Sequence, residues 1–203
     1  PKFPLQTYQE LPDPAAPSDK EWAAVTTTQV SWGTTDVRYA KHGLPRLKNQ
    51  QTVALKGWRG ERVNAQVVVW TGVELKDLNF SFGDFKDKKG NVLPQDAFTG
   101  GFVRYVMTDE LNKDGRGACG HRKAVDYDSL LVADPIDTSL KAMALPARTV
   151  QPVWVQCWIP QSAVPGTYKG ELLINDGSRL LQRLNLEITV SSRELPAPSE
   201  WAY

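Results

Sequence analysis

The stretch from residue 150 to residue 190 constrains the fold most, because its apolar side chains recur at every second position. In its first part, one face of an extended chain carries Val153, Val155, Cys157 and Ile159. The last part repeats the pattern with Leu184, Leu186, Ile188 and Val190. A period of two is typical of a pleated strand that buries one of its faces.

Two turn signals divide this stretch into three strands. Pro165 presets φ for the first central position of a turn, and Gly166 supplies the positive φ of the next. Asp176 and Gly177 tolerate the two positive φ angles that a type I′ hairpin turn requires. We therefore predict an antiparallel meander of three strands with one buried face.

Short strand patterns also recur upstream, over residues 27–32, 62–71, 75–85, 102–107 and 129–133. Turn signals separate them, including one at Asp134–Asp137, and residues 140–146 are predicted to be a loop with Leu145 tucked inward. No segment shows the period of an amphipathic helix. We predict an all-β fold, an antiparallel two-sheet β-sandwich of the immunoglobulin-like or galactose-binding-like kind, with an irregular N-terminal arm.

The distribution of proline predicts three regions. Residues 1–25 are rich in proline, which forbids a regular helix or a central strand, so they form an arm. Within it, Ser18 is placed to cap one helical turn ahead of Trp22. Residues 26–192 form the sandwich. Residues 193–203 form a Pro-rich linker, which we expect to lead into a further, C-terminal domain.

The charge balance argues against two classes of partner. Lys and Arg number 24 and Asp and Glu 23, which gives a net charge of +1. Nucleic acid or an anionic membrane surface would favour a basic protein, so we expect neither as the main partner. We also expect no membrane span, because no apolar run approaches the length that a span needs.

The common catalytic and metal-binding patterns are missing from the sequence. His42 and His121 are the two histidines, and neither stands at a zinc-ligand spacing. No GxSxG motif occurs, and nothing in the pattern orients a pair of Cys119 and His121 for nucleophilic chemistry. We therefore expect no catalytic residue, no metal and no cofactor.

Four aspartates cluster around the short strand at 129–133. A pair of carboxylates serves glycosidases, and several oxygens serve calcium. The spacing fits no calcium loop, and turns attract Asp for their own hydrogen bonds, so we interpret the cluster as turn structure. The four are Asp126, Asp128, Asp134 and Asp137.

The two cysteines leave two alternatives open. Cys119 lies in the polar stretch 109–128, which has no period and is long for a loop in a compact domain. Cys157 lies on the apolar face of its strand. Either the two form a disulfide that pins this stretch to the sandwich, or both stay free.

Trp154 and Trp158 are candidates for ligand binding, beside the stretch 109–128. They share a face of their strand, opposite the apolar one. If they are exposed, their rings are a platform on which a sugar can stack. The alternative, which we favour, is that the arm, the other sheet or another domain covers them, because exposed apolar patches of that size are unusual.

Several phrases together resemble a known family. They are WRGERVNAQ at 58–66, VRYV at 103–106, DSLLVAD at 128–134, QPVWV at 151–155 and IPQSAVPGTYKG at 159–170. This order is similar to the N-terminal β-sandwich domain of bacterial proteins of the glycoside hydrolase family 123 type, common in Bacteroidetes. The residues 198–201 resemble the point where that family's chain enters a (β/α)8 barrel.

The resemblance implies a parent protein like a β-N-acetylgalactosaminidase, in which an Asp-Glu pair of the barrel carries substrate-assisted catalysis. No catalytic residue transfers to this chain. The expected role is a non-catalytic accessory domain that packs against that barrel; the alternative is a carbohydrate-binding module. The parent is expected to be exported to the periplasm or outer surface, as a lipoprotein.

Overall fold

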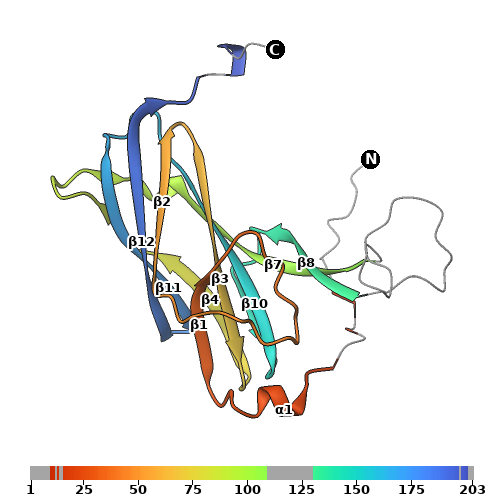
Figure 1. Cartoon of the computed structure of the whole chain (residues 1–203). Coiled ribbons are helices and arrows are strands. Elements are labelled where there is room, and N and C mark those ends of the chain that lie inside the picture. Colours follow the sequence, from red (N-terminus) through yellow and green to blue (C-terminus); the bar gives the residue numbers. More distant parts are fainter. Residues whose placement is uncertain (1–9, 12, 14–15, 109–129, 197, 201–203) are drawn as a thin grey trace, which may run out of the picture.

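Two β-sheets face one another in the computed structural model, which describes residues 10–11, 13, 16–108, 130–196 and 198–200 (Figure 1). The elements in chain order are α1 (Asp19–Trp22), β1 (Thr28–Gly33), β2 (Thr52–Arg59), β3 (Arg62–Thr71), β4 (Leu75–Phe82), β5 (Phe85–Lys86), β6 (Val92–Leu93), β7 (Phe98–Thr108), β8 (Leu130–Asp137), β9 (Ala142–Leu145), β10 (Thr149–Trp158), β11 (Gly166–Asp176) and β12 (Arg179–Glu194), with single 3₁₀ turns at Gln95–Ala97 and Pro198–Glu200. The predicted β-sandwich is confirmed.

The first sheet has the strand order β1-β3-β10-β7-β8, and every pairing in it is antiparallel. Its centre is the pair of β3 and β10, which stays in register from Arg62 opposite Trp158 to Thr71 opposite Thr149. The β-branched side chains of β3, Val67, Val68 and Val69, are fully buried, as expected of an interior strand.

The second sheet has the order β2-β12-β11-β4-β9, and the short strands β5 and β6 join it beside β11. One of its pairings departs from the expected antiparallel pattern, because β2 runs parallel to β12. Trp32 ties the two sheets together, since its indole N–H donates to the Asn185 carbonyl of β12 over 3.0 Å.

The predicted three-stranded meander is wrong in one respect. β11 and β12 do form an antiparallel hairpin, but β10 belongs to the other sheet, beside β3 and β7. After β10 the chain turns at Pro160, whose carbonyl accepts from Ala163, and crosses to the second sheet. The inner faces of β10 and β12 therefore contribute to one core between the sheets rather than lying edge to edge.

The hairpin between β11 and β12 uses a different turn from the one predicted. Asp176 pairs with Arg179, so the two-residue loop is Gly177–Ser178. Gly177 has a φ of +60° and Asp176 does not have a positive φ, so a type I′ turn centred on both is wrong. The Asp176 carboxylate instead accepts from the backbone N–H groups of Lys76 and Asp77, each over 3.0 Å.

Two segments predicted to be irregular are strands. β8 continues through the predicted turn at Asp134–Asp137, and the edge position of the strand accommodates Pro135, which lacks a backbone donor. Residues 142–145 form β9 against β4 rather than a loop, and Leu145 is buried as predicted. The last strand also runs past residue 192 to Glu194.

The arm packs on the outer face of the first sheet through Trp22. The Ser18 hydroxyl accepts from the Glu21 N–H and begins α1, as predicted. Trp22 is 2% exposed and packs with Tyr39, Val68 and Val150. Phe3 and Tyr8, the other aromatic residues of the arm, lie outside the described residues.

The core between the sheets makes a direct stability prediction at Gly100 of β7. A Cβ atom there would lie 2.3 Å from the Phe80 ring, which packs edge-on against Phe102 at 5.4 Å between centroids. Gly100→Ala should therefore lower the free energy of unfolding by about 1–3 kcal/mol in urea denaturation. Gly83→Ala is the control, because its Cβ would meet its nearest atom at 3.5 Å. Equal stability of the two variants would contradict the packing described.

Candidate functional site

One end of the sandwich combines exposed aromatic and basic side chains. It is built by the hairpin of β2 and β3, the end of β10 and the end of β12, where the chain leaves the sheet (Figure 1). We call it the tip surface and define it by Trp58, Arg62, Trp158, Arg193 and Leu195.

The hairpin that carries the tip surface is fixed by its backbone. Gly60 has a φ of +83°, a conformation that side chains rarely adopt, and its N–H donates to the Ile159 carbonyl over 2.8 Å. The Glu61 carboxylate accepts from the Trp58 N–H over 2.7 Å, and the Ile159 N–H donates to the Glu61 carbonyl over 2.9 Å. The hairpin is thereby bound to the end of β10.

Trp158 is held in place and still exposed. Its indole N–H donates to the Gly60 carbonyl over 3.1 Å, and the Arg62 guanidinium carbon lies 4.4 Å from the centre of its ring. The residue is nevertheless 55% exposed. A cation over an indole face is an attractive contact, so the ring is ordered by its neighbours before anything covers it.

Trp58 lies on β2 and belongs to the same surface. It is 37% exposed, and the Arg193 guanidinium carbon is 5.5 Å from its ring centre. A hollow of about 420 Å³ adjoins it. The residues that line the hollow are Lys56, Gly57, Trp58, Glu61 and Leu195.

Arg59 anchors the end of β12 to this surface. Its guanidinium contacts the Glu194 carboxylate at 3.0 Å and donates to the Gln161 carbonyl at 3.1 Å. Its carbonyl accepts from the Leu195 N–H over 2.8 Å. Within the described part of the chain, the buried Nε atom of Arg59 has no hydrogen-bond partner.

The two tryptophans predicted as a sugar platform have different surroundings in the structure. Trp154 is half-buried and packs on the cluster of Val103, Tyr105, Leu131 and Ala133, and its indole N–H donates to Asn64 over 3.2 Å. Side chains four residues apart on one strand are separated by about 13 Å. Trp154 and Trp158 do lie on one face, but their surroundings differ; the sugar platform stays a prediction.

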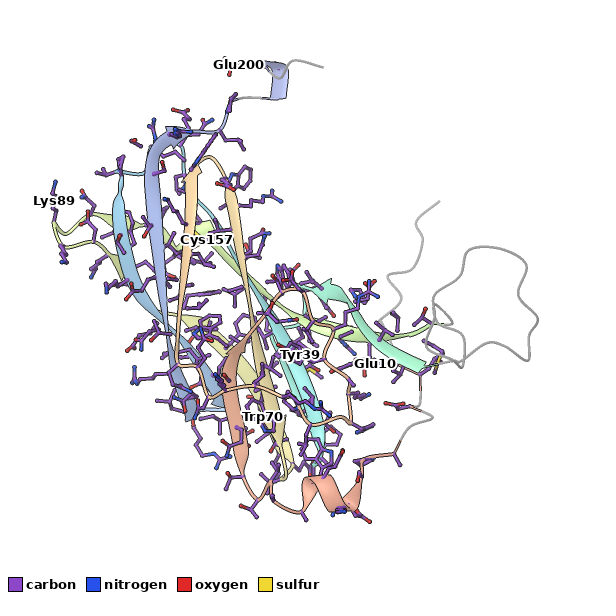
Figure 2. All side chains as sticks on the ribbon, in the orientation of Figure 1. Glu10, Tyr39, Trp70, Lys89, Cys157 and Glu200 are labelled. Atoms are coloured by element: carbon purple, nitrogen blue, oxygen red, sulfur yellow. The ribbon has the colours of Figure 1, made fainter. Side chains whose placement is uncertain are left out.

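Cys157 is buried in the core, where it is 1% exposed (Figure 2). Burial raises the pKa of its thiol to about 12, so a thiolate is strongly disfavoured there. Among the described residues it has no disulfide partner. Cys119 lies outside the described residues, as do His121 and the stretch 109–128, so the predicted alternatives for the pair stay open.

The remaining polar candidates have structural contacts. The His42 ring lies 3.1 Å from the Arg148 carbonyl through Nδ1 and 3.6 Å from Asp13 through Nε2. The Asp137 carboxylate accepts a hydrogen bond from the Ser139 hydroxyl. This hydrogen bond is the main reason why the pKa of the Asp137 carboxyl lies below its ordinary value. Among the described residues, no three His, Cys, Asp or Glu side chains gather to hold a metal ion.

Asp134, another of the four aspartates predicted to form turn structure, makes an exposed ion pair with Arg38 at 3.3 Å. Asp126 and Asp128 lie outside the described residues. Sequence reasoning missed Trp58, Arg193 and Leu195 as surface residues. The available signal is Gly60, which stands just before the strand pattern at 62–71. Its positive φ in the structure places Trp58 at the end of a hairpin.

Comparison with solved structures agrees with the sandwich. A family 123 glycoside hydrolase from Clostridium perfringens, described for glycolipid glycan hydrolysis, matches with a TM-score of 0.71 at 20% identity. The match covers 86% of this chain and 29% of that chain, so this chain spans less than a third of that enzyme. A PapD-like domain of human CEP192 matches with a TM-score of 0.41 at 12% identity, over 95% of this chain and 100% of that one.

The likeness to the family 123 enzyme concerns the fold alone. A search of curated proteins found no match. In the described part of the chain, no helix has the length and apolar character needed to cross a membrane. The family model for the glycoside hydrolase 123 N-terminal domain matches residues 32–176, well over half of the 203 residues. The resemblance read from the sequence is therefore confirmed, and the chain belongs to the glycoside hydrolase 123 N-terminal domain family.

Proposed function

We propose that this chain is a non-catalytic accessory domain of a glycoside hydrolase similar to β-N-acetylgalactosaminidases. Its tip surface packs against the catalytic barrel of the same polypeptide. The observation that carries the proposal is the pair of partly exposed tryptophans, Trp58 and Trp158, at the end from which β12 leads away. The family match supports the context of a longer hydrolase.

The composition of the tip surface suits a protein interface. Tryptophan and arginine are enriched among the residues that dominate binding energy, and each tryptophan here has an arginine over its ring. Covering Trp58 and Trp158 would remove a large apolar area from water without reordering the side chains.

The position of the chain's exit supports the same partner. The pairing of β12 with β2 extends to Glu194 opposite Arg59, and Leu195 is bonded to the Arg59 carbonyl. Whatever follows Leu195 therefore starts from a fixed point beside the tip surface. A domain joined there by a short linker meets this surface at a high effective concentration, so even a modest interface would stay closed.

Assayed alone, the chain should not hydrolyse aryl N-acetylhexosaminides, because the proposal assigns the chemistry to the barrel. The assay compares release of the chromophore by the 203-residue chain with a blank and with the parent enzyme. Turnover by the chain above the blank would overturn the non-catalytic assignment.

Removing the tryptophans should destabilise the parent enzyme more than the isolated chain. Trp58→Ala and Trp158→Ala should each cost about 2 kcal/mol or more of the parent's stability, since they truncate buried interface anchors there. In the isolated chain the same side chains face water and the cost should be small. Thermal unfolding of both forms measures this difference.

Leu180→Ala is the matched control, because Leu180 is 42% exposed and lies at the start of β12, at the opposite end of the sandwich. It should affect the parent and the isolated chain equally. The packing proposal fails if the tryptophan variants also affect both forms equally.

A second candidate function is glycan binding through Trp158. The specific observation in its favour is that the indole is 55% exposed and held by the Gly60 carbonyl and Arg62. An ordered, exposed ring is suited to stack on the apolar face of a sugar.

Calorimetry with galactosamine-containing oligosaccharides tests this candidate. If it holds, the chain releases binding heat at millimolar sugar, Trp158→Ala abolishes that heat, and Trp154→Ala, which alters a half-buried ring, reduces it less. Absence of heat from the unmodified chain at millimolar sugar would count against glycan binding.

A further inference from the structure

The first sheet splits between β7 and β10. The two strands pair from Phe98 opposite Cys157 to Phe102 opposite Val153, and no pairing between them continues beyond Phe102. At this point the register of β7 against β8 shifts between Val103 and Tyr105. β7 therefore diverges from β10, and the backbone groups that face each other across the split need other partners.

Side chains and a loop fill the split. The Gln151 side chain donates to the Val103 carbonyl over 2.8 Å, and the Tyr105 hydroxyl donates to the Val150 carbonyl over 2.9 Å. The same hydroxyl lies 3.1 Å from the Tyr39 carbonyl, and the Val150 N–H donates to the Lys41 carbonyl over 2.8 Å. The loop after β1 is thus bound into the split.

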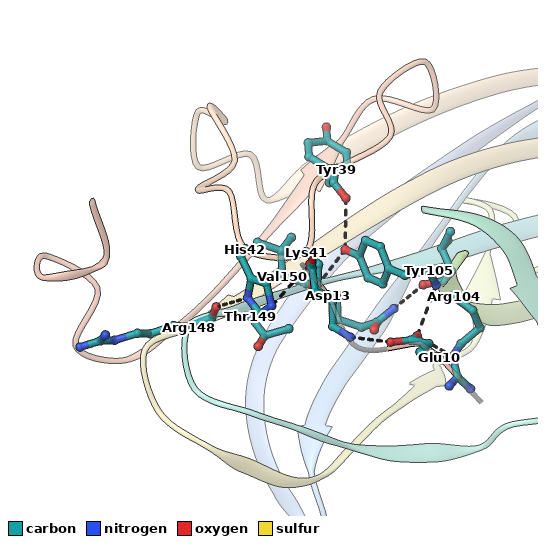
Figure 3. A network of polar contacts seen from close by, with 12 residues as sticks. Glu10, Asp13, Tyr39, Lys41, His42, Arg104, Tyr105, Arg148, Thr149 and Val150 are labelled. Atoms are coloured by element: carbon teal, nitrogen blue, oxygen red, sulfur yellow. Dashed lines mark hydrogen bonds and ion pairs between the residues drawn. The ribbon is translucent and has the colours of Figure 1, made fainter. Parts of the chain in front are cut away.

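The Glu10 carboxylate of the arm closes the open end of this arrangement (Figure 3). One oxygen accepts from Arg104 Nε over 3.0 Å and from the Tyr105 N–H over 3.3 Å, and the other accepts from Lys41 Nζ over 2.7 Å. The side chains of Glu10 and Arg104 are each only 14% exposed. One carboxylate thus joins the arm, the loop and β7.

The two ends of the arm are held by different forces. At its C-terminal end, Trp22 is buried in an apolar cluster and its indole N–H donates to the His42 carbonyl over 2.8 Å. Within the part of the chain that the structure describes, Glu10 is held by hydrogen bonds and ion pairs, and neighbouring Leu11 is 58% exposed. The Trp22 side chain is thus held mainly by apolar burial, whereas the Glu10 side chain is held by charged and polar partners.

We propose that Glu10 is a charge-operated latch: loss of its negative charge releases Glu10 from Lys41, Arg104 and the Tyr105 N–H and opens the split between β7 and β10, while Trp22 stays packed. This inference stands apart from the proposed accessory function, because it uses no residue of the tip surface. Partly buried Lys41 and Arg104 would then lose their shared anion, which makes the closed arrangement unfavourable.

The charged groups around the latch come from every neighbouring element. Lys41 and Arg104 contact Glu10 directly, and Asp137 of β8 contacts Arg104 at 3.4 Å. Asp13 lies further along the arm beside His42. After release Asp137 keeps its ion pair with Arg104, whereas the ion pair of Lys41 with Glu10 is lost.

Lowering the pH should open the latch, because protonation removes the negative charge of Glu10. Burial by itself raises the pKa of the Glu10 carboxyl, but the hydrogen bonds from Lys41 and Arg104 outweigh it, and the pKa lies below its ordinary value of 4.5. A carboxyl with a lowered pKa stabilises the closed form fully above its unfolded pKa. That stabilisation is lost as the pH falls through the lowered value.

Hydrogen exchange at the Tyr105 amide, which donates to Glu10, is the test. At neutral pH, Glu10→Gln should speed exchange at this amide by about tenfold or more, while the Val68 amide of β3 keeps its protection. Glu10→Ala should give at least the same change. As the pH falls through the lowered pKa of Glu10, exchange in the unmodified chain, corrected for the intrinsic exchange rate, should approach that of the Gln variant.

Glu187→Gln is the matched control, because Glu187 forms an ion pair with Lys169 on the far sheet. It should leave exchange at Tyr105 unchanged. Unchanged exchange at Tyr105 in both Glu10 variants would overturn the proposal. So would equal acceleration at Tyr105 and Val68, since that pattern means global unfolding rather than release of one end of the arm.

Discussion

The burial of β10 is the constraint on which the rest of the structure depends. The inner side chains of this strand, Val153, Val155 and Cys157, share one apolar core with Leu184, Leu186 and Ile188 of β12. The outer side of the strand is covered as well, through Val150 at one end and half-buried Trp154 further along. A strand whose inner face is buried, and whose outer face is covered over its first half, fixes its sheet neighbours, β3 and β7, and the layers that pack on it.

Alternation along the sequence predicted which side chains face inward, but not which strands are neighbours. The inner residues of β10 and β12 were identified from their period of two, because that period reflects burial alone. Whether two successive strands pair or face each other across a core leaves this period unchanged, so β10 was placed beside β11 in error. Strand neighbours also explain why β8 was predicted to end in a turn at Asp134. A strand can contain Pro135 when it lies at a sheet edge, and the sequence does not show which strand is the edge.

The candidate site was predictable only in part, because strands far apart in sequence assemble it. Trp158 stood out on the polar face of its own strand, but Trp58 and Arg193 meet only because β2 runs parallel to β12. The same pairing extends β12 to Glu194, although the sequence predicted that a Pro-rich linker begins at residue 193. Glu10 was hidden for the same reason: its partners, Lys41 and Arg104, are separated from it by 31 and 94 positions.

Both ends of the described chain are held by an arginine and a glutamate, yet they should respond differently to their surroundings. The Arg59 and Glu194 side chains are 28% and 45% exposed, so water and salt weaken their pair. The exit of β12 depends instead on its backbone pairing with β2 and on the Leu195 N–H. The pair of Arg104 and Glu10 is shielded, and at that end charge carries the contact. The exit of β12 is therefore held mainly by backbone hydrogen bonds, whereas Glu10 is held mainly by charged side chains.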